Sequence, residues 1–147
     1  MTKFLTVMTI FGLFAFKSYA LDLNDLKNLA EATAQFKQSV QEMEAVYDKG
    51  VIKADIIELK KINAHTTEVL KYCQVIETKF QQKAPEVLTR KQEARNRAIE
   101  KAESLLDAAD TDLRSAQVDF IKGLETAKYC LGLTSQMAAS IRASISQ

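Results

Sequence analysis

Few residues in this chain have types and spacings that support catalysis. His65 is the only histidine, and no nucleophile motif lies next to it. The sequence has no Gly-x-Ser-x-Gly elbow, no Gly-rich phosphate loop and no His-Glu-x-x-His zinc helix. Close carboxylate pairs occur, such as Asp110 with Asp112, but a di-metal helical bundle needs Glu-x-x-His pairs on two helices. We therefore expect a protein that is not an enzyme and uses no metal or other cofactor.

A run of basic residues supports binding rather than catalysis. Residues 79–101 hold seven basic and three acidic side chains, a local net charge of +4. We assign the patch to Lys83, Arg90, Lys91, Arg95, Arg97 and Lys101. Its matching partners would be sulfated glycan, phospholipid head groups or an acidic protein. A solvated helix face with ordinary charge pairs between neighbouring turns explains the same pattern, so both interpretations stay open.

The two cysteines, Cys73 and Cys130, predict a disulfide. In an oxidising compartment an even number of cysteines favours pairing. The alternative is two buried free thiols. The sequence alone also leaves open whether the bond forms within one chain or between two chains.

The first twenty residues have the pattern of an export signal. Lys3 supplies a positive charge, residues 4–16 form an apolar run, and Ser18 and Ala20 place small residues before a cleavage site after Ala20. The run is shorter than the roughly 20 residues of a membrane crossing, and no other run is long enough. We expect a secreted, extracellular protein with residues 1–20 as signal peptide and residues 21–147 as a single domain.

Net charge argues against nucleic acid as the partner. Removal of the signal takes away Lys3 and Lys17 and leaves 18 basic and 19 acidic residues, a formal net charge of −1. A nearly neutral protein has no overall field that attracts polyanions such as DNA or RNA. Any attraction of anions must then come from a local patch.

Hydrophobic spacing predicts long amphipathic helices. Apolar residues recur in heptad steps over residues 22–49 and continue on one side over residues 51–82, where Cys73 lies on the apolar stripe. Gly50 and Pro85 mark the two interruptions. Beyond Pro85 an eleven-residue period runs to Leu131, which by itself suggests one straight helix over 86–131.

The cysteines favour a turn within that stretch. On a straight helix Cys130 would lie roughly 45 Å beyond Cys73 by helical rise, whereas a disulfide tolerates at most about 7 Å between Cα atoms. Asp110 or Thr111 could cap a new helix after a turn. We predict an all-α, antiparallel four-helix bundle with helices over 22–49, 51–82, 86–109 and 111–131 and a short C-terminal helix over 133–147. The alternative is a three-helix coiled coil with one long helix over 86–131.

These features indicate a broad class of function but do not identify a particular partner. Export, helical patterning and the lack of catalytic groups favour a secreted, non-enzymatic protein that binds a protein or an anionic partner. The alternative is an extracellular carrier of lipid or another small apolar ligand, because an alanine-rich seam between helices leaves room for one.

Overall fold

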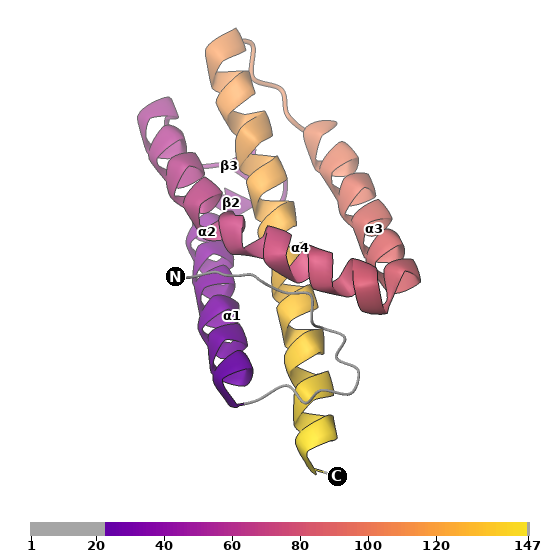
Figure 1. Cartoon of the computed structure of the whole chain (residues 1–147). Helices are drawn as coiled ribbons and strands as arrows, with labels where there is room; N and C mark the ends of the chain where they lie inside the picture. Colours follow the sequence, from indigo (N-terminus) through magenta and orange to yellow (C-terminus); the bar gives the residue numbers. More distant parts are fainter. Residues whose placement is uncertain (1–22, 147) are drawn as a thin grey trace.

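The computed structural model describes residues 23–146 and is built almost entirely from helices (Figure 1). The signal peptide predicted for residues 1–20 lies outside these residues. The elements in chain order are α1 (Leu23–Glu44), β2 (Tyr47–Asp48), β3 (Val51–Ile52), α2 (Ile56–Lys83), α3 (Pro85–Glu103) and α4 (Thr111–Ser146). The prediction of an all-α helical bundle is confirmed.

Helix α4 is the centre of the bundle, and the other three helices pack against it (Figure 1). Buried residues form two clusters at different levels of α4. Leu29 of α1, Ile76 of α2 and Leu88 of α3 belong to the cluster around the later part of α4. Val40 of α1, Leu59 of α2 and Ala102 of α3 belong to the cluster around its first half. Helices α1 and α3 therefore run antiparallel to α4, whereas α2 runs in the same direction and crosses it obliquely.

The connection between α1 and α2 differs from the prediction. Helix α1 ends at Glu44, not near residue 49, and a two-stranded hairpin follows in which Tyr47 pairs with Ile52. Lys49 and Gly50 form its turn with φ of +49° and +88°. Two consecutive positive φ angles define the type I′ turn, whose twist matches that of paired strands. Gly50 thus serves a hairpin rather than a helix terminus.

Helix α2 begins at Ile56, five residues later than predicted, because a capping side chain is available there. The Asp55 carboxylate accepts a hydrogen bond from the Glu58 backbone N–H at 2.8 Å. Asp55 is therefore a side-chain N-cap of the usual kind. At the other end Pro85 occupies the first turn of α3, the helical position that tolerates a missing N–H.

The predicted turn before Asp110 is confirmed, and the single long helix over 86–131 is wrong. Helix α3 ends at Glu103, six residues earlier than predicted, and α4 begins at Thr111. The Asp110 carboxylate accepts a hydrogen bond from the Leu113 N–H at 2.9 Å, which caps α4. The early end of α3 also breaks the eleven-residue pattern, because Leu106 is buried while Leu105 is 56% exposed.

The separate C-terminal helix predicted for residues 133–147 does not form. Helix α4 continues through Gly132 to Ser146 as one helix. Leu133, Met137 and Ile141 follow at four-residue steps and are all buried against the bundle. Their burial outweighs the roughly 1 kcal/mol that a glycine costs inside a helix.

Among residues 23–146 no helix is both long and apolar enough to cross a membrane.

Candidate functional site

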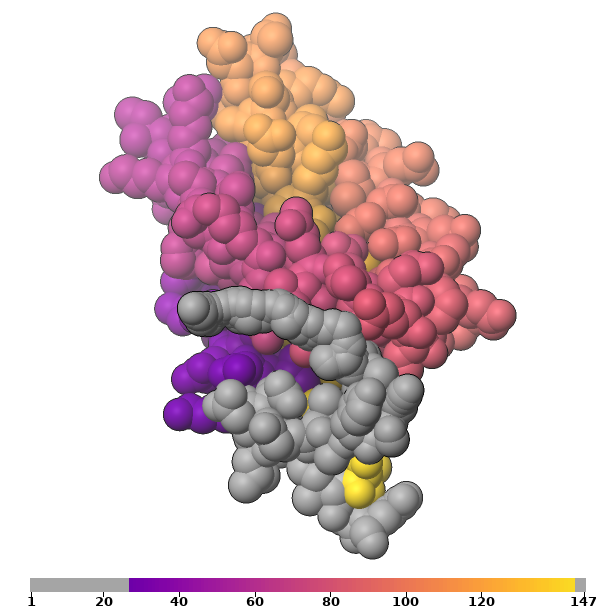
Figure 2. All heavy atoms as spheres, viewed as in Figure 1, coloured from indigo at the N-terminus to yellow at the C-terminus, as the bar shows by residue number. Residues whose placement is uncertain are grey.

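The predicted basic patch divides between two sides of α3. Arg90, Arg97 and Lys101 are exposed and recur at steps of seven and four residues, so they form one stripe on the outward side of the helix, which we call the cationic stripe. Lys91 and Arg95 are half-buried and lie on the side that faces the bundle. In Figure 2 the side chains of α3 form the right-hand edge of the molecule.

Lys83, the remaining member of the patch, is exposed at the last residue of α2. The one-residue connection at Ala84 places it directly before the first turn of α3. The fold therefore puts Lys83 at the corner between α2 and α3, apart from the outward stripe. The exposed cations of the patch comprise this corner residue and the three residues of the stripe.

Within residues 23–146, the exposed cations of the stripe lack carboxylate partners, as do Lys37, Lys60 and Lys61 on α1 and α2. Lys53, Lys71 and Lys128 form ion pairs with acidic residues at 2.6 to 3.8 Å. Within residues 23–146, Arg90, Lys91, Arg97 and Lys101 form no such pair. Three acidic residues lie on the neighbouring stripe of the same helix, namely Glu86, Glu93 and Glu100. The cationic stripe therefore offers positive charge to solvent beside a parallel row of negative charge.

Arg95 takes part in a junction that joins α3 to the other helices. Its guanidinium lies over the ring of Tyr129, 4.6 Å from the centroid. The Tyr129 hydroxyl donates a hydrogen bond to the Glu77 carboxylate at 2.6 Å, and Gln92 donates to the same oxygen at 3.4 Å. Burial raises the pKa of Tyr129 above its ordinary value, and the adjacent Glu77 carboxylate raises it further. Tyr129 thus stays a neutral donor, and Arg95 has a structural contact instead of a place in the cationic stripe.

The disulfide lies beside this junction. Cys73 and Cys130 are bonded within one chain, with their Cα atoms 5.7 Å apart. Cys73 is 3% exposed and Cys130 is fully buried, so both sulfur atoms belong to the core. The bond ties α2 to α4 one residue away from Tyr129. The second half of α2 is consequently attached to the centre of the bundle by a covalent link and by a hydrogen-bonded cluster.

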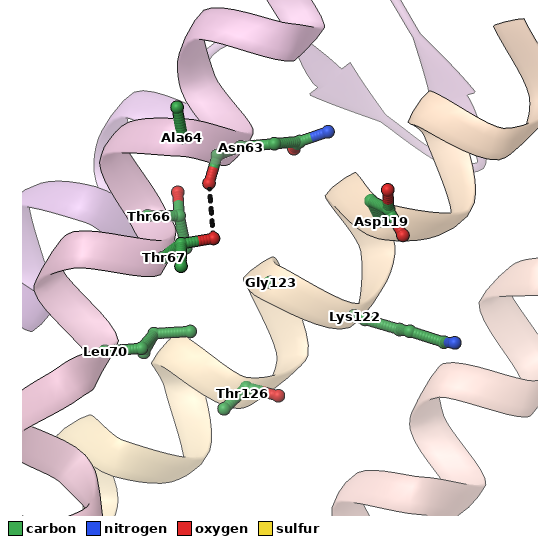
Figure 3. A pocket seen from close by; sticks show the side chains of 9 residues that line it. All are labelled: Asn63, Ala64, Thr66, Thr67, Leu70, Asp119, Lys122, Gly123 and Thr126. Carbon is green, nitrogen blue, oxygen red and sulfur yellow. Dashed lines mark hydrogen bonds between the residues drawn. The ribbon is translucent and has the colours of Figure 1, made fainter. Parts of the chain in front are cut away.

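A groove of about 470 Å³ lies between the first half of α2 and the first half of α4 (Figure 3). Thr67 and Leu70 line one side, and Asp119, Lys122 and Gly123 line the other. The Thr67 hydroxyl already donates to a backbone carbonyl of its own helix at 2.9 Å. In Figure 3 the Lys122 side chain extends away from α2. The charged groups therefore do not converge on a point where a substrate could react.

His65 lies at a second, smaller groove of about 320 Å³ between α1 and α2. It is exposed, and its Nε2 lies 4.0 Å from the Glu42 carboxylate. Gln35, Gln38 and Glu68 share the groove with it, and none of them has a hydroxyl or thiol that His65 could activate. Within residues 23–146 no group of three or more metal-ligating side chains comes together. The described part of the chain therefore offers no catalytic constellation around its one histidine.

Sequence reasoning missed the Glu77–Tyr129–Arg95 cluster. The three residues come from three helices, and Glu77 and Tyr129 are 52 positions apart. The only sequence signal was that Tyr129 adjoins a cysteine expected in the core, so that its hydroxyl would need a buried partner. Which of the many carboxylates supplies that partner depends on how the helices pack.

Comparison of the chain with protein-family models, with curated proteins and with solved structures finds no match in any of the three.

Proposed function

We propose that the protein is a secreted, non-enzymatic binding protein that presents the outward face of α3 to an anionic partner. The disulfide and the lack of a membrane-spanning helix among residues 23–146 fit an extracellular protein. The export signal expected at residues 1–20 supports the same location. Binding, rather than catalysis, is the role that the available side chains support.

The observation that carries the proposal is the alignment of three exposed, unpaired cations along one side of α3. Arg90, Arg97 and Lys101 point outward from one helix and have no carboxylate partner within the described residues. An anion that binds them need not first break an existing ion pair. Arginine adds geometric selectivity, because its planar group donates two parallel hydrogen bonds to a carboxylate, phosphate or sulfate.

The surroundings of α3 support a rigid presentation of these charges. The Tyr129 ring contacts Arg95 on the inner side, and Glu77 holds the Tyr129 hydroxyl. Leu88 and Ala102 are buried on the apolar side of the helix. A helix that is already ordered loses little conformational entropy when a partner binds. The proposed surface is therefore ready before binding.

The alternative role, a carrier of lipid or another apolar ligand, has less support. The two grooves described above are lined mostly by polar side chains. A carrier that opens its bundle would also have to separate helices that the Cys73–Cys130 bond joins. Both features favour a polar partner at the surface over an apolar one between the helices.

The test compares two triple variants that lose the same charge. Arg90→Gln/Arg97→Gln/Lys101→Gln removes the cationic stripe, whereas Lys37→Gln/Lys60→Gln/Lys61→Gln removes three exposed lysines on α1 and α2. Binding to immobilised dextran sulfate and poly-L-glutamate is measured at low and at high salt. We expect the wild-type chain to bind at low salt and the stripe variant to lose most of that binding with a weaker salt dependence.

The control variant should bind as the wild-type chain does. Equal loss in both variants would mean that general charge, not α3, attracts the anions, and the proposed site would be wrong. If neither anion retains the wild-type protein at low salt, the proposed function itself is contradicted. Circular dichroism of all three proteins checks that the helices are intact.

A further inference from the structure

The cationic stripe is linear, and its geometry restricts what it can bind. Arg90 and Arg97 are two turns apart, about 10 Å along the axis, and Lys101 lies about 6 Å further on by helical rise. Cations this far apart along a rod do not converge on a single phosphate or sulfate. The stripe instead matches several anionic groups that are themselves arranged in a line.

The neighbouring acidic row restricts the width of the partner. Glu86, Glu93 and Glu100 lie beside the stripe on the exposed side of α3. The full diameter of a helix with its side chains is only about 10–12 Å, so the two rows are a few ångströms apart. A lipid surface or a nucleic-acid duplex is broad enough to meet both rows, and the glutamates would repel it. A thin single chain can follow the basic row alone.

The composition of α3 restricts which kinds of chain-like partner can bind to it. Helix α3 has no aromatic residue, so it offers no platform on which the bases of single-stranded DNA or RNA could stack. The outward side also has no large apolar residue that could enter a membrane. A sulfated glycan is a single chain that carries acidic groups at intervals along its length, which is the arrangement that a linear row of cations requires.

We infer that the anionic partner is a linear sulfated glycan that lies along α3 and contacts Arg90, Arg97 and Lys101 in order. This inference rests on the proposed function and specifies its ligand. Each contact is an exposed ion pair of modest strength, so the affinity depends on how many groups of the glycan reach the stripe at once.

The test uses size-defined heparin oligosaccharides, inorganic sulfate, oligothymidylate and anionic phospholipid vesicles as probes, with affinity measured by isothermal titration calorimetry. We expect affinity to rise about tenfold from the disaccharide to the hexasaccharide, the equivalent of one or two added exposed ion pairs, and then to level off. Inorganic sulfate should not compete at equal sulfate concentration.

A register variant tests the linear arrangement at constant charge. Arg90→Gln/Thr89→Arg moves one cation about 100° around α3, from the stripe to the acidic side, without changing the net charge. We expect this variant to bind the hexasaccharide several-fold more weakly than the wild-type protein. A matched substitution pair on α2, Lys60→Gln/Ala64→Arg, also keeps the net charge and should leave the affinity unchanged.

The outcomes separate this inference from the proposed function. Unchanged affinity of the register variant, combined with loss of binding in the triple stripe variant, would refute the linear arrangement and keep α3 as an anion-binding surface. Equal or tighter binding of oligothymidylate or vesicles would refute the glycan as the ligand class. Failure of every anionic probe to bind would overturn both the inference and the proposed function.

Discussion

The Tyr129 hydroxyl donates a hydrogen bond to the Glu77 carboxylate at 2.6 Å and so connects the centre of α4 to α2. Arg95 of α3 lies over the same tyrosine ring, 4.6 Å from its centroid. One aromatic side chain therefore contacts both α2 and α3, the two helices that meet at Ala84. Together with the buried Leu88 and Ala102, this cluster attaches to the bundle the helix that carries the proposed binding surface.

Tyr129→Phe should destabilise the fold while leaving its packing intact. The substitution keeps the ring under Arg95 and removes only the hydroxyl, so Glu77 loses its shortest hydrogen bond. A hydrogen bond to a charged group contributes about 1.5–3 kcal/mol, and we expect a loss near the lower end because Glu77 is only half-buried. Urea unfolding followed by circular dichroism measures the change.

The matched control is Tyr47→Phe. Tyr47 is half-buried, whereas Tyr129 is buried; the Tyr47 ring packs against Phe120 at 6.0 Å, and within the described residues its hydroxyl has no hydrogen-bond partner. We expect its free energy of unfolding to change by less than about 0.5 kcal/mol. If the two variants lose equal stability, the Tyr129–Glu77 hydrogen bond makes no measurable contribution to the free energy of unfolding.

Stability should fall at alkaline pH because of Tyr129. Burial and the Glu77 carboxylate raise its folded-state pKa above the ordinary value of 10.0. In the pH range above 10 the unfolded chain loses this proton while the folded chain keeps it, so stability declines as pH rises. The contribution is fully present below pH 10. The pH dependence of urea unfolding in the wild-type protein, minus that of Tyr129→Phe, isolates the effect, and identical profiles would contradict it.

Loss of the disulfide should cost several kcal/mol. Cys73 and Cys130 are 57 residues apart, and a cross-link of that length lowers the entropy of the unfolded chain by the equivalent of about 4 kcal/mol. Cys73→Ala/Cys130→Ala should therefore unfold at much lower urea concentration than the oxidised wild-type protein. Reduced wild-type protein should resemble the double variant, which separates the cross-link from side-chain packing. A covalent dimer on a non-reducing gel would contradict the bond within one chain.

Two glycines of α4 should respond to alanine in opposite directions. A Cβ at Gly132 would meet nothing within 4 Å, so Gly132→Ala should raise stability by up to about 1 kcal/mol through helix propensity. A Cβ at Gly123 would lie 3.2 Å from Thr66 Cγ2 and 3.3 Å from Met43 Cε. Thr66 is buried and β-branched, so it cannot easily move aside. Gly123→Ala should lose about 1 kcal/mol in net stability, because an overpacking cost of about 2 kcal/mol exceeds the gain in helix propensity.

Thermal unfolding of the two alanine variants in one buffer checks this contrast. Both substitutions add the same methyl group to the same helix, so their difference reports the close approach of α2 and α4 at Gly123. Equal stabilisation in both variants would mean that the two helices have room to separate.

Lys49→Asn should stabilise the hairpin. Lys49 has a φ of +49°, a conformation that costs a residue with an ordinary side chain about 1 kcal/mol and that asparagine tolerates better. Asn-Gly is also the preferred pair in a type I′ turn. We expect a gain of about 0.5 kcal/mol, measured by urea unfolding.

Gly50→Ala, at the next position of the turn, should have the opposite effect on stability. Its φ of +88° disfavours a side chain, and a Cβ would lie 3.3 Å from Leu105 Cδ1. This substitution should destabilise the protein, and no loss would show that the turn rearranges freely.

Local sequence determined the helices and most of their apolar sides. The stripe through Leu59, Thr66, Cys73, Ile76 and Phe80 is buried as its spacing predicted, because helical periodicity is a property of the chain itself. The capping carboxylate of Asp110 and the proline at residue 85 likewise act through their immediate neighbours. Predicting the fold from these signals succeeded because each one needs only a few adjacent residues.

Tertiary structure decided the points that depend on distant partners. Whether Gly132 ends a helix depends on the bundle that buries Leu133 and Met137, and whether Leu105 or Leu106 is buried depends on where α3 stops. The same holds for the basic patch, in which only packing separates Arg95 at Tyr129 from Arg97 in solvent. Spacing along a chain reports which residues share a side of a helix, whereas contacts between helices determine which of those sides remains open to a partner.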